Sequence, residues 1–363
     1  MEQIAIYPYN DAYAPVVRHQ NLMHGMRIAS LISPKGWGYN GECIKTDDAE
    51  LIVSDNFAAE IGKCSAVWFV DDAFVPLPKV LLEDKLREAL KQNKKILFTR
   101  SLKADEEDVK SLIPDAKEIK FEIEDYFWEE HSKTCYNINT PVIFVLGLTE
   151  NTDKFEVQLA LREQLLQKGY NISSVSSRRD SAILGMHPLP SFLFDGGTCE
   201  TEKILSYNHL IKQIELRESP EIIIIGIPGG AFPFSNNKHN YFGITAYEIS
   251  NAVTCDCAIF CSPYLDYSVD LDSFPRISNE AYGKFGFSID YFHIAARTFD
   301  YFYEQPHEEN FNWVTLDTAF VDAKIKTYDK DNIYNLLQPH EIQWLTEKVI
   351  DQLSDAAPKA QSI

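Results

Sequence analysis

The sequence lacks any long apolar run. No stretch reaches the roughly 18–20 consecutive apolar residues that a membrane-spanning helix needs, and the longest, around Ile222–Ile225, has the length of a strand. The first residues carry no basic segment of the kind that opens a secretory signal. We therefore expect a cytoplasmic protein that does not enter a membrane.

Basic residues are scarce. The 34 Lys and Arg residues stand against 54 Asp and Glu residues and leave a net charge of −20. The basic residues form no stripe beyond short runs such as Lys91–Lys95, so a polyanionic partner would be repelled. This balance argues against nucleic acid and anionic membrane surfaces as partners.

Cysteine is sparse as well, and its pattern does not indicate pairing. The seven cysteines are odd in number and scattered, so we do not expect a disulfide framework. Cys255, Cys257 and Cys261 form one cluster, on one face of a strand by the period of two. Structural zinc sites usually add a second pair or a histidine, and none is evident. We favour a buried strand with small apolar thiols and keep these cysteines as weak metal candidates.

The sequence is rich in short apolar strands that alternate with amphipathic helices. A hydrophobic content of 45% suits a packed core, and 363 residues fit two domains. Because strands that alternate with helices favour parallel sheets, we predict two Rossmann-like α/β domains. Their expected bounds are 1–135 and 136–353, with a flexible tail at 354–363 and the boundary within the polar segment 131–140.

The expected elements follow from apolar periodicity. In the first half the predicted strands are Ile4–Tyr7, Arg27–Ser33, Leu51–Ser54, Ala66–Val70 and Ile96–Thr99, with a helix over Val80–Gln92. In the second half the predicted strands are Val142–Leu146, Asn171–Val175, Glu221–Ile225 and Cys257–Cys261. The predicted helices there are Phe155–Lys168, Glu200–Arg217 and Tyr291–Tyr303.

The segment after the strand Val142–Leu146 has the layout of a phosphate-binding loop. Gly147 opens the loop, and Lys154 stands where the next helix begins. In a working loop a glycine precedes this lysine, and a Ser or Thr follows it to hold Mg²⁺. Here those positions are Asp153 and Phe155. We therefore predict that the second domain resembles a P-loop NTPase in fold but is degenerate in its motif.

Carboxylates crowd this loop. Glu150, Asp153 and Glu156 lie close together in the sequence, and like charges about 4 Å apart repel by on the order of 1–4 kcal/mol. Such a loop suits a cation, an amine or an internal ion pair better than a triphosphate. The neighbouring strand ends in Gly226, where an acidic Mg²⁺ ligand would be needed. We keep nucleotide binding open, do not expect hydrolysis, and assign no cofactor.

Four more residues are ligand candidates because they follow strand ends, where open α/β sheets bind ligands. Gly229 and Gly230 either face a ligand or turn the chain tightly off a buried strand. His239 is either an acid, base or anion contact or a surface histidine without a role. Arg178 either faces the same crevice or belongs to a solvated turn.

Two features of the first half are weaker candidates. Asp71 and Asp72 end a strand, where acidic pairs can hold Mg²⁺. The loop Ser33–Gly41 is rich in glycine and aromatic residues, and is either a lid, a partner-binding loop or an ordinary long turn. Because no nucleophile or acid–base motif is present, no catalytic residue is assigned.

Four segments of the second half and two of the first stand out in combination. They are Asp153–Glu163, Gly185–Phe192, Ile224–Gly230, Tyr241–Glu248, Ile6–Asn10 and Ser33–Gly38. Together they resemble a family of clostridial peptide-maturation system proteins. The resemblance implies an accessory role beside a ribosomally made, cysteine-rich bacteriocin-type peptide and a radical SAM maturase. The precursor peptide and the maturase are the expected partners, and no established reaction comes with the resemblance.

Two other classes remain as alternatives. One is an ATP- or GTP-dependent, ligase- or amidase-like enzyme with an unconventional metal site, in which Glu150, Asp153 or Glu156 replaces the missing Mg²⁺ ligands. The other is a metal-binding protein that uses the three clustered cysteines. Both differ from the favoured function, a non-hydrolytic protein that binds a precursor peptide, its maturase or a small ligand.

Overall fold

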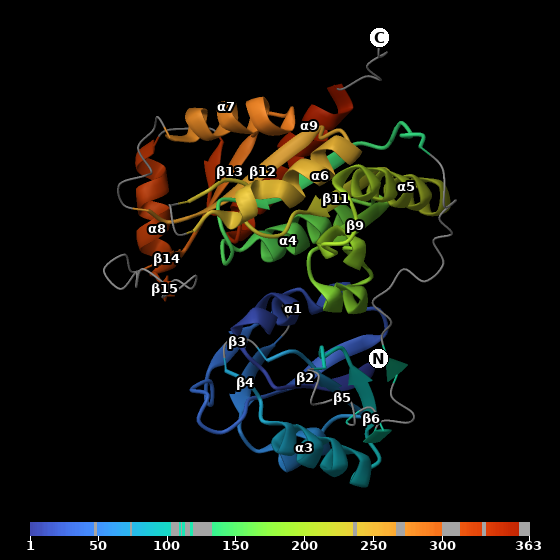
Figure 1. Cartoon of the computed structure of the whole chain (residues 1–363). Coiled ribbons are helices and arrows are strands. Elements are labelled where there is room, and N and C mark those ends of the chain that lie inside the picture. The colour runs from blue at the N-terminus through green and yellow to red at the C-terminus, as the bar shows by residue number, and fades with distance from the viewer. Residues whose placement is uncertain are drawn as a thin grey trace. The chain divides into compact units, whose positions relative to one another are not determined.

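The computed structural model describes residues 1–46, 49–72, 75–102, 109, 111–112, 117–118, 133–234, 238–265, 273–299, 313–328 and 332–355. The chain forms two compact units. The first contains Met1–Ile123 and Arg178–Pro188, and the second contains Glu124–Ser177 and Leu189–Ile363. Each unit is built on a largely parallel sheet with interleaved helices (Figure 1), so the predicted fold class of two Rossmann-like α/β domains is confirmed.

The sheet of the first unit has the strand order β3-β4-β2-β1-β5-β6-β7. These strands are β1 (Glu2–Tyr7), β2 (Met26–Ile32), β3 (Cys43–Lys45), β4 (Glu50–Ser54), β5 (Ala66–Phe69), β6 (Lys95–Phe98) and β7 (Lys117–Glu118). All neighbours are parallel except β3 and β4. The chain leaves β1 toward one edge of the sheet and later returns to the other side of β1 with β5. Outside the carboxyl ends of β1 and β5 lies the point at which such sheets bind ligands.

Helices cover the first sheet. They are α1 (Ala14–Arg18), α2 (Phe57–Gly62) and α3 (Lys79–Lys91), and three 3₁₀ turns add η1 (Asp11–Tyr13), η2 (Gln20–Leu22) and η4 (Arg179–Leu184). The core on one face joins Phe57 and Ile61 of α2 and Leu82 and Leu86 of α3 with alternate residues of the strands. The turn η4 and the two-residue strand β10 (His187–Pro188) lie in the segment that joins this unit late in the sequence.

The second sheet contains the strand order β9-β11-β8-β12-β13-β16, and its recorded pairings are parallel. These strands are β8 (Val142–Gly147), β9 (Ile172–Ser176), β11 (Ile222–Gly226), β12 (Cys257–Pro263), β13 (Tyr291–Ala295) and β16 (Ile333–Tyr334). A separate antiparallel pair joins β14 (Arg297–Phe299) to β15 (Trp313–Thr315). The predicted strands of this half are thus confirmed to within two residues.

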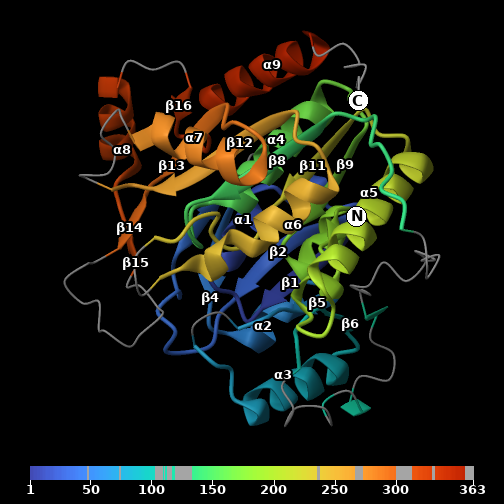
Figure 2. The same ribbon diagram turned by 45° about the horizontal axis from the view of Figure 1, so that its top comes forward.

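Helices lie on both faces of the second sheet (Figures 1 and 2). They are α4 (Lys154–Gln167), α5 (Glu200–Glu218), α6 (Ile244–Ala252), α7 (Ser273–Phe285), α8 (Thr318–Ile325) and α9 (Pro339–Asp355), with 3₁₀ turns η5 (Ser191–Phe194), η6 (Asn240–Gly243) and η8 (Lys326–Tyr328). Val157 and Leu161 of α4 and Leu345 of α9 share one core with the strands. On the other face, Phe274 of α7 packs against Phe292 of β13, with ring centroids 4.7 Å apart. None of the described helices is long and apolar enough to cross a membrane.

Two predictions about secondary structure need correction. The predicted helix Tyr291–Tyr303 is wrong, because its described part forms strands β13 and β14. Residues 292–295 are all buried, and a strand covered on both faces shows a continuous apolar run instead of an alternating one. The predicted tail begins too early, since Ser354 still lies in α9; residues 356–363 lie outside the described part of the chain.

Candidate functional site

The loop between β8 and α4 turns within very little space. A Cβ atom on Gly147 would lie 2.7 Å from Thr152 Oγ1 and 2.8 Å from the Cys261 carbonyl oxygen. Asn151 and Asp153 both have left-handed backbones, with φ of 55° and 60°. Such conformations are uncommon for residues other than glycine, so the surrounding contacts must hold this loop in place.

Lys154 is bound within its own unit. Its ammonium group donates hydrogen bonds to the carbonyl oxygens of Thr149 at 2.6 Å and of Gly229 at 2.7 Å. Burial lowers the pKa of Lys154, and the nearby Glu150 carboxylate acts in the opposite direction. The lysine of the predicted phosphate loop thus ties this loop to the turn after β11.

Asp153 faces two basic side chains that the sequence did not single out. Its carboxylate lies 3.5 Å from Arg297 Nε and 3.7 Å from His293 Nε2. The Nδ1 atom of His293 accepts a hydrogen bond from the Leu336 N–H at 3.0 Å, so the neutral ring carries its proton on Nε2, toward Asp153. With Nδ1 engaged and Nε2 facing a carboxylate, His293 is not placed as a base for Cys261, its register partner on β12.

The glycines after β11 allow a close approach of main chains. A Cβ atom on Gly230 would lie 2.4 Å from the Leu148 carbonyl oxygen and 2.3 Å from Asn240 Nδ2. The Asn240 amide donates to the carbonyl oxygens of Leu148 at 2.9 Å and of Phe232 at 2.6 Å. Gly229 has φ of 70°. Gly230 therefore meets a steric need, and Gly229 adopts a left-handed backbone that favours glycine.

Gly226 has a packing role too. A Cβ atom there would lie 2.5 Å from the side-chain oxygen of Gln158, a residue of α4. The Gln158 amide donates to the carbonyl oxygens of Val175 at 2.8 Å and of Ile224 at 3.3 Å. A carboxylate at position 226 would collide with this buried amide.

A strained turn follows these glycines. Asn240, Tyr241, Phe242 and Gly243 are consecutive and left-handed, with φ of 50°, 48°, 56° and 67°. Two of them are aromatic residues that rarely adopt this conformation. The Lys284 ammonium donates to the carbonyl oxygens of Phe242 and Ala231, and a Cβ atom on Gly243 would lie only 2.1 Å from Ala231 O.

Large side chains of this turn lie in solvent. Tyr241 is 76% exposed, Phe242 58%, Ile244 48% and Tyr247 45%. The His239 ring stacks on the Phe242 ring with centroids 5.1 Å apart and an angle of 4°. We call residues 239–247 the aromatic turn. His239, a candidate from the sequence, thus contributes to an exposed aromatic surface.

Arg178 does not belong to this group of residues. It lies in the first unit, where it forms an ion pair with Asp180 at 2.5 Å. Its guanidinium also lies 4.6 Å from the centre of the Tyr13 ring. These contacts hold the Arg178 side chain against other residues of the first unit.

The other candidates of the first unit have partners within that unit. The Asp72 carboxylate pairs with Arg100 at 3.0 Å, and Asp71 Oδ1 accepts a hydrogen bond from the Ser101 N–H at 2.7 Å. The Asn10 amide donates to the Asp71 carbonyl oxygen at 3.1 Å, which joins the segments that follow β1 and β5. The carboxyl ends of these strands are thus connected by the protein's own side chains.

The clustered cysteines lie in or beside strand β12. Cys257 and Cys261 are fully buried, and the Cys255 thiol donates to the Cys257 carbonyl oxygen at 3.3 Å. Burial raises the pKa of all three thiols well above the usual range. Among the described residues, no group of three or more His, Cys, Asp or Glu side chains is arranged to hold a metal ion.

Known proteins give a likeness in fold only. No protein-family model matches the chain, and no curated protein matches it. Among solved structures, the chain is similar to the crystal structure of a DUF1611 family protein from Anabaena variabilis ATCC 29413, with a TM-score of 0.61 and 10% identity. The alignment covers 97% of this chain and 100% of that one.

Proposed function

We propose that this chain is a non-hydrolytic accessory protein in the maturation of a ribosomally made peptide. In this proposal the second unit binds a peptide partner, the precursor or a segment of its maturase, through the aromatic turn. The peptide context comes from the sequence resemblance, and the binding role comes from the geometry of the turn.

The observation that carries the proposal is the strained, exposed pair Tyr241 and Phe242. Left-handed conformations of such residues cost roughly 1–2 kcal/mol each and persist where the surrounding structure enforces them, often at functional sites. Here Asn240, Gly243 and Lys284 supply that enforcement. Aromatic side chains fixed in solvent at little further entropic cost are typical anchors of protein and peptide interfaces.

The loop after β8 supports the non-hydrolytic part of the proposal. Lys154 donates to two carbonyl oxygens of the protein, which are acceptors that compete with phosphate oxygens. The next residue is Phe155, which has no hydroxyl group for Mg²⁺. Gly226 is packed against Gln158, so the second position for a metal ligand has no room for a carboxylate side chain.

The first experiment measures peptide binding. A phage-displayed peptide library is selected on the purified chain, and the enriched peptides are synthesised with a fluorescent label for anisotropy titrations. We expect Tyr241→Ser/Phe242→Ser to weaken binding by about tenfold or more. Phe194→Ser, which removes another aromatic side chain that is 57% exposed in the same unit, should leave the affinity unchanged. Equal affinities for all three proteins would contradict the proposal.

The second experiment tests the peptide context and the absence of hydrolysis. Deletion of the gene should abolish modification of the peptide in the producing strain. The Phe194→Ser variant should restore modification, and the turn double variant should not. Purified chain incubated with ATP or GTP and Mg²⁺ should release no phosphate. Phosphate release that disappears in Lys154→Met would favour the NTP-dependent enzyme instead.

A further inference from the structure

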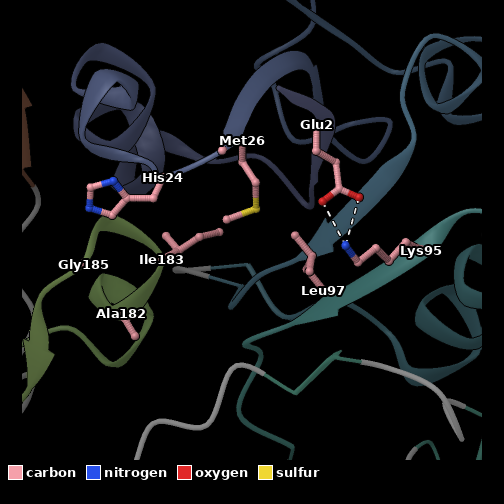
Figure 3. Close-up of a pocket in the computed structure, with 9 residues that line it drawn as sticks. Glu2, His24, Met26, Lys95, Leu97, Ala182, Ile183 and Gly185 are labelled. Atoms are coloured by element: carbon pink, nitrogen blue, oxygen red, sulfur yellow. Dashed lines mark hydrogen bonds and ion pairs between the residues drawn. The ribbon is translucent and has the colours of Figure 1, made fainter.

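A cavity in the first unit has the chemistry of a binding site and plays no part in the function proposed above. Its volume is about 370 Å³, within the range of roughly 300–1,000 Å³ that small-ligand pockets occupy. It lies at the amino ends of the strands, opposite the edge at which β1 and β5 end. Figure 3 shows an ion pair on one side, His24 on the other and apolar side chains between them.

The strand register places the polar groups on one face of the sheet. Glu2 is the register partner of Met26 on β2. Lys95 is the partner of Ala66, which is in turn the partner of Ile4, two residues beyond Glu2 on β1. Side chains two residues apart on a strand share a face, so Glu2, Met26 and Lys95 point to the same side.

The charged wall of the cavity is an ion pair that opens easily. Lys95 Nζ lies 3.0 and 2.9 Å from the two carboxylate oxygens of Glu2, and the two side chains are 37% and 26% exposed. Pairs of this exposure contribute only about 0–1 kcal/mol. A ligand that offers a carboxylate to Lys95 and an ammonium group to Glu2 replaces one ion pair by two charge-assisted contacts.

The walls between the ion pair and His24 are apolar. Leu97 and Ile183 are 3% and 5% exposed and line the cavity together with Met26 and Ala182. Ile183 and Ala182 come from the turn η4, and Gly25, with φ of 74° and no atom within 4 Å of a built Cβ, leaves space beside Met26. Apolar walls next to paired opposite charges match a molecule with an apolar side chain and adjacent opposite charges.

We propose that this cavity binds a free α-amino acid with an apolar side chain. The carboxylate of the ligand meets Lys95, its ammonium group meets Glu2, and its side chain lies against Met26, Leu97 and Ile183. The ligand is bound and not transformed in this proposal. The site is independent of the aromatic turn, so either proposal can fail alone.

The test uses L-leucine as the probe and the full chain with a purification tag at the C-terminus. Isothermal titration calorimetry should give saturable binding of L-leucine. N-acetyl-L-leucine lacks the ammonium group and L-leucinamide lacks the carboxylate, so each should bind at least about tenfold more weakly. Equal binding of the three compounds, or no saturable binding at millimolar concentration, would overturn the proposal.

Variants of the ion pair make the test specific to this cavity. Glu2→Gln and Lys95→Met should each weaken L-leucine binding by about tenfold, with thermal unfolding midpoints that show intact folding. The exchange Glu2→Lys/Lys95→Glu keeps both charges and should retain binding with the ligand reversed. Lys45→Met removes an exposed partner of Glu50 in the same unit and should change nothing. Binding that is insensitive to Glu2 and Lys95 would place the ligand elsewhere.

Discussion

The loop after β8 and the aromatic turn are joined by the hydrogen bond from the Asn240 amide to the Leu148 carbonyl oxygen, yet their side chains have different surroundings. In the loop, Lys154 and Asp153 face groups of the protein itself. In the turn, the backbone is held in a strained conformation, and Tyr241 and Phe242 lie in solvent. A place at the carboxyl edge of a sheet therefore does not by itself make a residue available to a ligand. The partners that a side chain already has decide this.

The largest expected effect is that of a methyl group on Gly243, which tests how closely the main chain at Gly243 approaches the main chain at Ala231. Its Cβ atom would lie 2.1 Å from Ala231 O at φ of 67°. We expect Gly243→Ala to lower the free energy of unfolding by roughly 2–5 kcal/mol, from overpacking and from left-handed strain. Urea denaturation followed by tryptophan fluorescence measures this loss.

Gly283 provides the matched control, because it lies in α7 with no atom within 4 Å of a built Cβ. Gly283→Ala should raise stability by about 0.5–1 kcal/mol, since alanine loses less entropy in a helix. If Gly243→Ala is as mild as this control, the main chains at the turn do not approach as closely as described.

The next effect tests whether Lys154 holds the loop after β8 through its hydrogen bonds to Thr149 and Gly229. Lys154→Met keeps the length of the side chain but leaves the carbonyl oxygens of Thr149 and Gly229 without their donor. We expect a loss of about 1–3 kcal/mol in the free energy of unfolding. Lys168→Met removes an exposed pair with Glu347 at 3.3 Å and should cost at most about 0.5 kcal/mol. Equal stabilities of the two variants would mean that the loop is open.

The fold could be predicted from the sequence because most helices and strands have a characteristic local pattern of apolar residues. Strands such as Val142–Leu146 are short apolar runs, and α4 spaces Val157, Leu161 and Leu165 at helical intervals. Strand β13 could not be identified in this way. It is covered on both faces, so its apolar residues show no period that separates a strand from a helix.

The candidate site was less accessible to such reasoning. The position of Lys154 at the start of α4 follows from the motif, but its bond to the Gly229 carbonyl oxygen depends on how the chain turns after β11. His293 and Arg297 approach Asp153 only because β13 lies on the far side of β12 from β8. The left-handed turn carries no signal in the sequence, since Tyr241 and Phe242 seldom adopt such a backbone.

A pH-dependent effect of intermediate size tests the helix that follows the turn. Glu248 of α6 is 1% exposed, and neither of its carboxylate oxygens has a hydrogen-bond partner among the described residues. The ammonium group of Lys203 lies 3.6 Å away. Burial raises the pKa of Glu248 above its ordinary value of 4.5, while Lys203 acts in the opposite direction.

The raised pKa means that the folded state keeps the Glu248 carboxyl protonated to a higher pH than the unfolded state does. The free energy of unfolding should therefore fall as the pH rises above the pKa that Glu248 has in the unfolded chain. Glu248→Gln removes that fall, so the variant should gain stability relative to the natural chain between acidic and neutral pH. Glu202→Gln, an exposed change on α5 at a residue that is not among the charges acting on Glu248, should follow the natural chain at every pH. Urea denaturation at several pH values gives both curves, and parallel curves for all three proteins would show that Glu248 is not desolvated.

The smallest expected effect is the most direct test of strain in the turn. Tyr241→Gly removes a left-handed penalty of roughly 1–2 kcal/mol and adds the entropy cost of glycine, roughly 0.5–1 kcal/mol. The net result should be a stability that is unchanged or up to about 1.5 kcal/mol higher. Tyr247→Gly lies in the regular helix α6 and should instead lose about 1 kcal/mol. Each change removes one exposed tyrosine ring, so a gain in the free energy of unfolding for Tyr241→Gly and a loss for Tyr247→Gly isolate the effect of the backbone at position 241. Equal losses in urea denaturation would show that the turn stores no strain.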